Sequence, residues 1–273
     1  MTQEHIEVCI PTRKRTTSLA LTIAQIFGNS TLPTTSVALG VDEDDSETLA
    51  FVEELGYAWP DRTIRLVVSP PKTGGLGVAN MVLRSSTAPL VLLGVDDMRI
   101  MGKGWDRHLF HHFLEDSSLS GVGMYLPHNH KSWVGVRVPA AYSQGVAQFN
   151  FVDREGDWVF YYPTLWCMRK ESLERVGYYF EGYTKWWSDL DLVCSFVEHD
   201  LKVIGCTIPQ VYSIDRLLTD DDLSRIKYGL EIVNQRWCNV PFIRKIRDWN
   251  ARKWCNCVHT LEHSYPYRET EQM

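Results

Sequence analysis

The sequence predicts an α/β fold in which helices flank a mainly parallel central sheet. Strand-length apolar runs alternate with helix-length amphipathic segments through roughly the first 115 residues, a pattern typical of a parallel sheet wound by right-handed crossovers. The run that begins at Leu90 is continuously apolar, as expected for a strand buried on both faces. A chain of 273 residues, with 44% hydrophobic and 23% charged residues, is long enough for a large core and has an ordinary globular composition.

Four strands, each followed by a helix, are expected in the first half of the chain. The strands are expected over residues 6–10, 36–41, 63–68 and 90–95. The helices are expected over residues 16–27, 47–56, 78–85 and 105–114. Thr16 or Thr17 could cap the first helix, since a threonine side chain can accept a hydrogen bond from the first turn.

A glycine-rich turn precedes the third helix. It runs from Pro70 to Asn80, and glycines at such a place let backbone N–H groups approach a phosphate or ribose. The spacing fits neither the dinucleotide-binding fingerprint nor the phosphate-binding loop. Glycines that serve only tight packing remain the alternative.

The sequence of the second half of the chain predicts a less regular arrangement of strands and helices. Residues 121–161 lack a helical period and are rich in β-branched and aromatic residues, which favours mixed or antiparallel strands and loops. Strands are then expected over residues 163–169 and 202–208, and helices over residues 171–176, 188–197, 220–233 and 241–254.

Composition excludes several classes of protein. A net charge of −6 argues against a generally basic nucleic-acid-binding protein. Seven cysteines, an odd number, do not form the framework of a secreted disulfide scaffold and favour a reducing compartment. The sequence contains no run of about eighteen apolar residues, the length that spans a membrane, and the N-terminus lacks the apolar core of a signal peptide. We therefore expect a cytoplasmic protein.

Two adjacent carboxylates, Asp96 and Asp97, follow the buried strand that begins at Leu90. In open α/β sheets, ligands collect beyond the carboxyl ends of the strands. Hard oxygen ligands suit Mg²⁺ or Mn²⁺, which often bridge one or two carboxylates to a substrate phosphate. The alternative is a solvated turn that closes a core strand.

Several motifs carry a resemblance to a known family. In the first half they are Ile10-Pro11-Thr12-Arg13, Asp42, Gly74-Gly75-Leu76 with Asn80, Asp96-Asp97, and Gly104-Trp105-Asp106. In the second half they are residues 165–177 and Ser188-Asp189-Leu190-Asp191-Leu192, which is similar to E-D-x-D-L. Their order resembles the nucleotide-sugar glycosyltransferases of the GT-A fold, most closely inverting family 2, over roughly residues 6–215.

The resemblance implies a domain organisation and a set of site residues. It implies a Rossmann-like GT-A domain over residues 1–215, with a nucleotide-sugar-binding half (1–115) and an acceptor and catalytic-base half (116–215). A helical extension, 216–273, would pack on the same domain. The residues that the resemblance assigns to the donor are Pro11, Thr12, Arg13, Asp42, Gly75, Asn80 and Asp96. Asp189 is the expected general base, although Ser188 stands where the family has glutamate.

The resemblance also implies a divalent metal, Mn²⁺ or Mg²⁺. A strict D-x-D motif would need an acid in place of Met98, so metal binding falls to Asp97 and Asp96 faces the ribose. Asp215 is a further candidate ligand. The expected reaction moves a sugar from a nucleotide sugar, with a UDP-sugar favoured, to an acceptor hydroxyl with inversion, and Asp189 takes the proton of that hydroxyl.

The acceptor stays open among a glycan, a lipid-linked sugar and a modified DNA base. Trp166, Trp186 and Trp187 could stack on it, although core packing is the commoner fate of tryptophan. The basic, aromatic segment that begins at Phe242 and ends at Trp254 could lie on an anionic membrane surface or along a nucleic acid, or could be an ordinary solvated helix.

Two rival functions and one further site remain possible on the sequence. The first rival is a phage-type DNA glycosyltransferase that acts on hydroxymethylated pyrimidines, and the second is a non-catalytic module that binds a sugar nucleotide or a glycan. The C-terminal region also contains a set of residues with weak zinc-site spacing, namely Cys238, Cys255, Cys257, His259 and His263. Gln235-Arg236-Trp237 superficially resembles the Q-x-x-R-W motif of processive membrane synthases, but its spacing is wrong.

Overall fold

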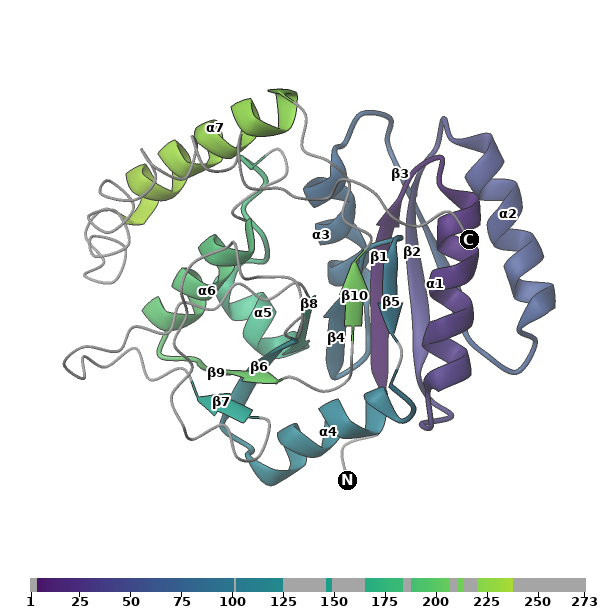
Figure 1. Ribbon diagram of the computed structural model, residues 1–273, viewed down its shortest axis with the longest axis horizontal. Helices are drawn as coiled ribbons and strands as arrows, with labels where there is room; N and C mark the ends of the chain where they lie inside the picture. The colour runs from purple at the N-terminus through teal and green to yellow at the C-terminus, as the bar shows by residue number, and fades with distance from the viewer. Residues whose placement is uncertain are drawn as a thin grey trace, which may run out of the picture.

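The computed structural model describes residues 4–100, 102–124, 146–148, 165–183, 188–206, 211–213 and 220–237. Within these residues, eight strands form one sheet in the order β3-β2-β1-β4-β8-β6-β9-β7, and β10 pairs with β5 in a separate ribbon (Figure 1). The strands are β1 (Ile6–Thr12), β2 (Ser36–Asp42), β3 (Ile64–Ser69), β4 (Leu90–Leu93), β5 (Met98–Ile100), β6 (Leu119–Met124), β7 (Val146–Gln148), β8 (Leu165–Arg169), β9 (Lys202–Cys206) and β10 (Val211–Ser213). The helices are α1 (Thr16–Asn29), α2 (Ser46–Ala58), α3 (Gly75–Ser85), α4 (Trp105–Glu115), α5 (Lys170–Val176), α6 (Ser188–Glu198) and α7 (Asp220–Trp237).

The sheet is parallel in its first half and mixed in its second. β1 pairs in parallel with β2 and β4, and β2 pairs in parallel with β3. β8 then runs antiparallel between β4 and β6, while β9 is parallel to β6 and antiparallel to β7. This order confirms the predicted fold class, a mainly parallel sheet followed by a mixed portion.

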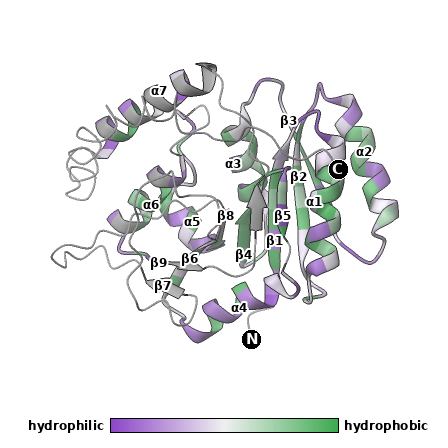
Figure 2. Cartoon of the chain, viewed as in Figure 1, coloured by the Kyte–Doolittle hydropathy of each residue, from purple (hydrophilic) through white to green (hydrophobic). Residues whose placement is uncertain are grey.

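Helices cover both faces of the sheet, because its central strands are apolar on both sides. Side chains of α1, α2 and α4 pack on one face, and side chains of α3, α5 and α6 pack on the other. Figure 2 shows the central strands β1, β2 and β4 largely in the hydrophobic colour. Gly40 in β2 allows α3 to lie close, since a Cβ atom there would come within 2.5 Å of side chains of Val78 and Val82.

The ends of several elements differ from the prediction. Neither Thr16 nor Thr17 caps α1: the helix begins at Thr16 itself, and the N-cap position belongs to Arg15, which makes no side-chain cap. Helix α3 begins at Gly75, with Gly74 at a φ of 82° before it, so the helix starts earlier than its apolar pattern indicated. The predicted helix over residues 241–254 lies outside the described residues.

The ribbon formed by β5 and β10 was not predicted. The predicted strand over residues 90–95 ends at Leu93, and the chain forms β5 immediately after the two acids. β5 pairs antiparallel with β10, which lies more than a hundred positions further along the chain. No helix in the described part of the chain is long and apolar enough to cross a membrane.

Candidate active site

The residues singled out in the first half meet at one edge of the sheet. β1, β2 and β4 are parallel, so their carboxyl ends lie together. Thr12 ends β1, Asp42 ends β2, and Asp96 and Asp97 follow β4 after a short turn. Segments far apart in the sequence therefore supply one cluster of polar side chains.

The two acids after β4 share one cation. Arg15 donates from one guanidinium nitrogen to Oδ1 of Asp96 at 2.6 Å and from the other to Oδ2 of Asp97 at 2.8 Å. The hydroxyl of Thr12 donates to Oδ2 of Asp96 at 3.0 Å. Asp96 is only 6% exposed. Burial raises the pKa of Asp96, and the positive charge of Arg15 opposes that shift.

The backbone around the acids is held by β1 and α1. Gly94 donates its N–H to the carbonyl of Cys9 in β1 at 2.9 Å. The hydroxyl of Thr22, buried in α1, lies 2.9 Å from the carbonyl oxygen of Asp96 and 3.0 Å from that of Met98. The acids therefore sit on a turn whose position is fixed by its neighbours.

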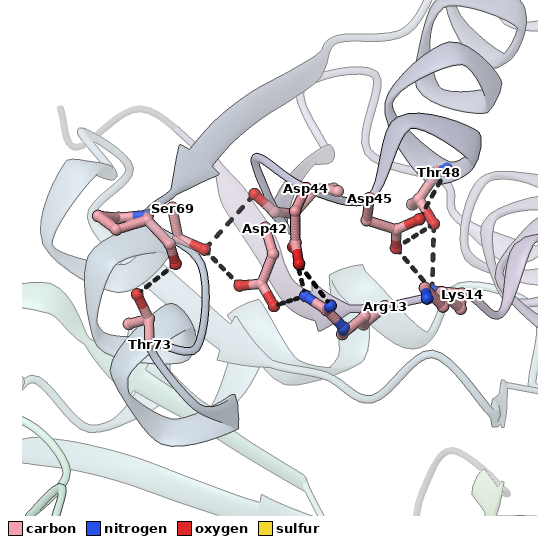
Figure 3. Close-up of polar contacts among 10 residues, drawn as sticks. Arg13, Lys14, Asp42, Asp44, Asp45, Thr48, Ser69 and Thr73 are labelled. Atoms are coloured by element: carbon pink, nitrogen blue, oxygen red, sulfur yellow. Dashed lines mark hydrogen bonds and ion pairs between the residues drawn. The ribbon is translucent and has the colours of Figure 1, made fainter.

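A second group of charged residues surrounds Asp42 (Figure 3). Asp42 is buried and accepts hydrogen bonds from Arg13 and, at 2.7 Å, from the hydroxyl of Ser69. Arg13 also makes a two-point contact with Asp44, at 2.7 and 2.9 Å. The hydrogen bond from Arg13 lowers the pKa of Asp44. Pro11 lies half-buried in β1, just before these residues.

The glycine-rich turn leads into α3 beside this group. Gly75 is the first residue of the helix, where backbone N–H groups have no partner within the helix and can face an anion. Thr73 closes the turn by donating to the carbonyl of Pro70 at 2.6 Å (Figure 3). Gly75 thus remains a candidate for contact with a donor phosphate.

The structure argues against a donor-binding role for Asn80. Its side chain is fully buried and donates to the carbonyl of Tyr179 at 2.7 Å and to the carboxylate of Glu181 at 2.8 Å. Its side-chain oxygen accepts the N–H of Tyr179 at 3.0 Å. These bonds fasten the segment after α5 onto α3, so the hydrogen-bonding groups of Asn80 already serve the fold.

The expected base, Asp189, lies in the first turn of α6 and is half-buried. Asp191, two residues further on, is 2% exposed. Each residue of an α-helix turns by about 100°, so two residues separated by two positions point to nearly opposite sides. Asp191 therefore holds the inner side of α6 while Asp189 lies on the other side.

Three residues from two other segments donate hydrogen bonds to the carboxylate of Asp191. The hydroxyl of Tyr183 donates to it at 3.0 Å, the Nε of Arg236 at 2.7 Å and the indole N–H of Trp237 at 2.6 Å. Burial raises the pKa of Tyr183, and the charge of Asp191 adds to the shift. The guanidinium of Arg236 also lies 3.8 Å from the centre of the Phe180 ring.

Sequence reasoning missed this cluster around Asp191. The available signal was the second acid of Ser188-Asp189-Leu190-Asp191, together with an arginine–tryptophan pair in the C-terminal helix. Nothing in the spacing of these residues along the chain links them, because the pair lies 45 and 46 positions after Asp191.

The structure argues against an acceptor-stacking role for Trp166. This residue lies in β8, is 3% exposed and packs in the core on the face covered by α3 and α6. A ring that is enclosed in this way offers no face to an acceptor. The other acceptor-side candidates, Trp186 and Trp187, lie outside the described residues, as do Asp215, the segment from Phe242 to Trp254 and the C-terminal Cys and His set.

The acids after β4 fit a divalent cation as a partial set of ligands. No group of three or more His, Cys, Asp or Glu side chains gathers as a metal site within the described ranges. A Mg²⁺ or Mn²⁺ ion commonly takes only one or two carboxylates from the protein and completes its shell with substrate phosphates and water. The guanidinium of Arg15, which bridges Asp96 and Asp97, shows that a cation can be held at this position.

Comparisons with known proteins agree with this architecture. The model of the family described as "Glycosyltransferase like family 2" matches residues 3–213. Among solved structures, S. aureus TarS 1–349 in complex with UDP has a TM-score of 0.59 and 14% identity, over 96% of this chain and 81% of that chain. The mannosyltransferase PcManGT from Pyrobaculum calidifontis, in complex with GDP-Man and Mn²⁺, has a TM-score of 0.60 and 14% identity, over 94% and 84%. No curated protein matches the chain.

Proposed function

The chain belongs to the family described as "Glycosyltransferase like family 2", and we propose from this that it transfers a sugar from a nucleotide-sugar donor. The donor would bind at the carboxyl ends of β1, β2 and β4. The observation that carries the proposal is the meeting of Asp42, Asp96 and Asp97 at one edge of the sheet, with Arg13 and Arg15 beside them. A sugar nucleotide is bound by acids that accept hydrogen bonds from its ribose or base and by cations that face its phosphates.

Each group at this edge has a proposed task. Asp42, with Arg13 and Ser69 around it, receives the base. Thr12 orients Asp96 toward the ribose, and the N-terminus of α3 at Gly75 faces the phosphates. Pro11, in β1 directly before Thr12 and Arg13, would contact the donor with them. Of the two similar structures, TarS 1–349 is in complex with UDP and PcManGT with GDP-Man, and among donors we favour a UDP-sugar.

A divalent ion belongs to the proposal, and Asp97 is the residue that would hold it. When bound, Mn²⁺ or Mg²⁺ supplies positive charge where the leaving diphosphate becomes more negative. Asp96 is oriented by Thr12 and Arg15, and Asp97 carries one of the carboxylate oxygens that face Arg15. Asp215 would be a further ligand. PcManGT has Mn²⁺ beside GDP-Man, which favours a metal in this chain too.

Asp189 is the proposed general base. Its carboxylate would take the proton of the acceptor hydroxyl as that oxygen attacks the anomeric carbon in line with the leaving diphosphate, so the reaction would invert the anomeric centre. The buried side of α6 is fixed through Asp191, which keeps the helix that carries Asp189 in one orientation. Family membership favours this enzyme over a non-catalytic module, and the acceptor could be a glycan, a lipid-linked sugar or a modified DNA base.

The experiment that tests the donor site measures thermal stability with UDP-, GDP-, CMP- and dTDP-sugars, each with and without Mn²⁺. A ligand present at about 100 times its Kd stabilises the fold by about 2.7 kcal/mol, so one nucleotide should raise the Tm clearly. We expect metal to strengthen this shift in the wild type and Asp97→Ala to remove the metal-dependent part.

Asp61→Ala is the control, because Asp61 is an exposed acid just before β3, at the opposite end of the parallel strands from the cluster, and it contacts none of the cluster's residues in the part of the chain that the structure describes. This variant should keep the full metal-dependent shift. If no nucleotide changes the Tm of the wild type in the presence of Mn²⁺, the donor site is not at this edge and the proposed function is wrong.

A further inference from the structure

Arg15 occupies an unusual place for a surface arginine. It stands at the N-cap position of α1, where its side chain makes no cap, and it reaches across to residues 81 and 82 positions further along the chain. Each of its two terminal nitrogens contacts a different carboxylate, Asp96 at 2.6 Å and Asp97 at 2.8 Å. The guanidinium therefore bridges the pair that the proposed metal would use.

Asp96 is held by its neighbours, whereas the Arg15 side chain is half-exposed. The backbone at Asp96 is held by Thr22, and the Asp96 side chain by the buried hydroxyl of Thr12. The Arg15 side chain is 49% exposed, compared with 8% for that of Asp96. A long, half-exposed arginine can change rotamer at little cost, so it can leave the acids without any change in the backbone.

Arg15 and a divalent ion cannot both sit on this pair at low cost. Two carboxylates carry two negative charges, and Arg15 together with the ion would place three positive charges against them within a few ångströms. Two like unit charges about 4 Å apart repel by about 4 kcal/mol at the effective dielectric constant of about 20 that suits a protein surface, and a divalent ion would repel the guanidinium about twice as strongly. Metal binding to the free protein must therefore displace Arg15.

A nucleoside diphosphate changes this balance. Its phosphates bring negative charge to the same strand ends, and they offer a guanidinium the two-point contact that a carboxylate pair offers. A guanidinium that has left Asp97 would then still have an anionic partner. The donor thus lowers the cost of replacing Arg15 on the acids.

We propose that Arg15 is the internal counter-ion of Asp96 and Asp97, and that it yields the pair to the divalent cation only when a nucleoside diphosphate arrives to receive its guanidinium. This role rests on the proposed function, because it assigns the exchange to the proposed donor and metal site. It makes Arg15 a donor-positioning residue, and it couples the binding of the nucleotide to that of the metal.

The experiment measures Mn²⁺ binding by isothermal titration calorimetry, first with Mn²⁺ alone and then with saturating UDP or GDP. The proteins are the wild type, Arg15→Gln and Lys14→Gln. Lys14 is the matched control: it is adjacent and exposed, its loss removes the same charge, and its side chain makes no contact with Asp96 or Asp97 among the described residues.

We expect Arg15→Gln to bind Mn²⁺ alone at least about fivefold more tightly than the wild type does, which is the lower end of typical coupling between two sites. Lys14→Gln should stay within about twofold of the wild type. The factor by which the nucleotide tightens Mn²⁺ binding should fall in Arg15→Gln, since the competing cation is already gone. This variant should also bind UDP or GDP more weakly in EDTA, because the phosphates have lost a partner.

Three results would overturn the inference. They are an unchanged Mn²⁺ affinity in Arg15→Gln, an increase that Lys14→Gln reproduces in full, and a loss of Mn²⁺ binding in Arg15→Gln. If metal-dependent nucleotide binding persists in all three proteins, only the role of Arg15 fails and the proposed function stands. If none of them binds a nucleotide with Mn²⁺ present, the proposed donor site fails together with the inference.

Discussion

Asp106 shows how much of the fold can depend on one side chain. Its carboxylate is fully buried and accepts the backbone N–H groups of Thr31 and Leu32, each at 2.9 Å, and the hydroxyl of Thr35 at 2.7 Å. Trp105, beside it, donates its indole N–H to a carbonyl of α1 at 3.1 Å. The glycine–tryptophan–aspartate motif after the acids thus fastens α4 to the loop that follows α1, which is a structural task.

At the scale of single residues, the prediction concerns Asp189. Asp189→Asn should lower the rate of sugar transfer, or of donor hydrolysis if the acceptor is unknown, by about 10² to 10⁴-fold, because an amide cannot take the proton of the attacking hydroxyl. The affinity for UDP or GDP should change little, since the proposed base lies away from the nucleotide. Steady-state kinetics and calorimetry with the purified variant check both statements.

Asp200→Asn serves as the control for this substitution. Asp200 is exposed just beyond the other end of α6 and has a φ of 54°, a conformation that asparagine tolerates well. It should therefore keep near-normal turnover. Near-normal turnover in Asp189→Asn itself would show that Asp189 is not the base.

At the scale of elements, the contact of α7 with α6 links the C-terminal region to the catalytic half. Arg236 and Trp237, in the last turn of α7, both reach the buried carboxylate of Asp191 in α6. The Trp237 side chain is itself buried. In the part of this region that the structure describes, α7 thus packs against α6.

Removing Arg236 should weaken this contact and disturb catalysis. Arg236→Ala leaves the buried carboxylate of Asp191 without its charged donor, and the loss of a hydrogen bond to a charged group costs about 1.5 to 3 kcal/mol. We expect a lower Tm and a larger effect on kcat than on the KM for the donor, because α6 carries the proposed base. Thermal melts and initial-rate kinetics measure these effects.

Two further variants sharpen the interpretation of Arg236. Gln235→Ala changes the exposed neighbour and should leave both quantities unchanged. Arg236→Lys retains a positive charge, so it should recover part of the stability lost in Arg236→Ala. An Arg236→Ala protein with wild-type Tm and kcat would show that α7 plays no part in holding α6.

The order of elements was predictable from the sequence, whereas several of their ends were not. Apolar runs of strand length and amphipathic helical periods depend on local residues, so β1, α1, β2 and their successors were located within a few positions. The start of α1 was predicted at Thr16, but its N-cap was not, because local rules favour a threonine cap whereas Arg15 takes the position and its side chain contacts an acid 81 positions away. The pairing of β5 with β10 was missed for the same reason, since neither short strand has a local signal.

The site could be predicted only where residues follow the ends of strands. Asp42, Asp96 and Asp97 were located because the carboxyl ends of parallel strands meet at one edge. The contacts of Asn80 could not be predicted, because its position in a glycine-rich motif suggested a ligand, while its partner Tyr179 lies 99 positions further on. The three donors to Asp191 were missed because only the tertiary fold brings them together.

At the scale of the whole molecule, protection from solvent falls from the centre of the sheet to its edge. β1 lies between β2 and β4, and its Ile6, Val8 and Ile10 are fully buried. β3 is the edge strand beside β2, and its Leu66 and Val68 are exposed. The proposed donor site therefore lies at the carboxyl ends of the most enclosed strands of the described sheet.

Hydrogen exchange should report this gradient. Backbone amides of β1 and β4 should exchange slowest, at rates set by global unfolding, and those of β3 should exchange faster through local opening. Mass spectrometry of peptides from the exchanged protein measures both. Equal protection in β3 and β1 would mean that the sheet opens only as one unit.

The pairing of β6 with β8 has a consequence for how such a protein can evolve. Met124, the last residue of β6, lies directly opposite Leu165, the first residue of β8. The connection between them, residues 125–164, therefore begins and ends at neighbouring points of the sheet, and it includes the edge strand β7. Doubling the length of such a connection costs only about 0.6 kcal/mol in loop-closure entropy. Selection can thus change the length of this connection on either side of β7, while β2 and β4, which precede the acids of the proposed donor site, keep their registers.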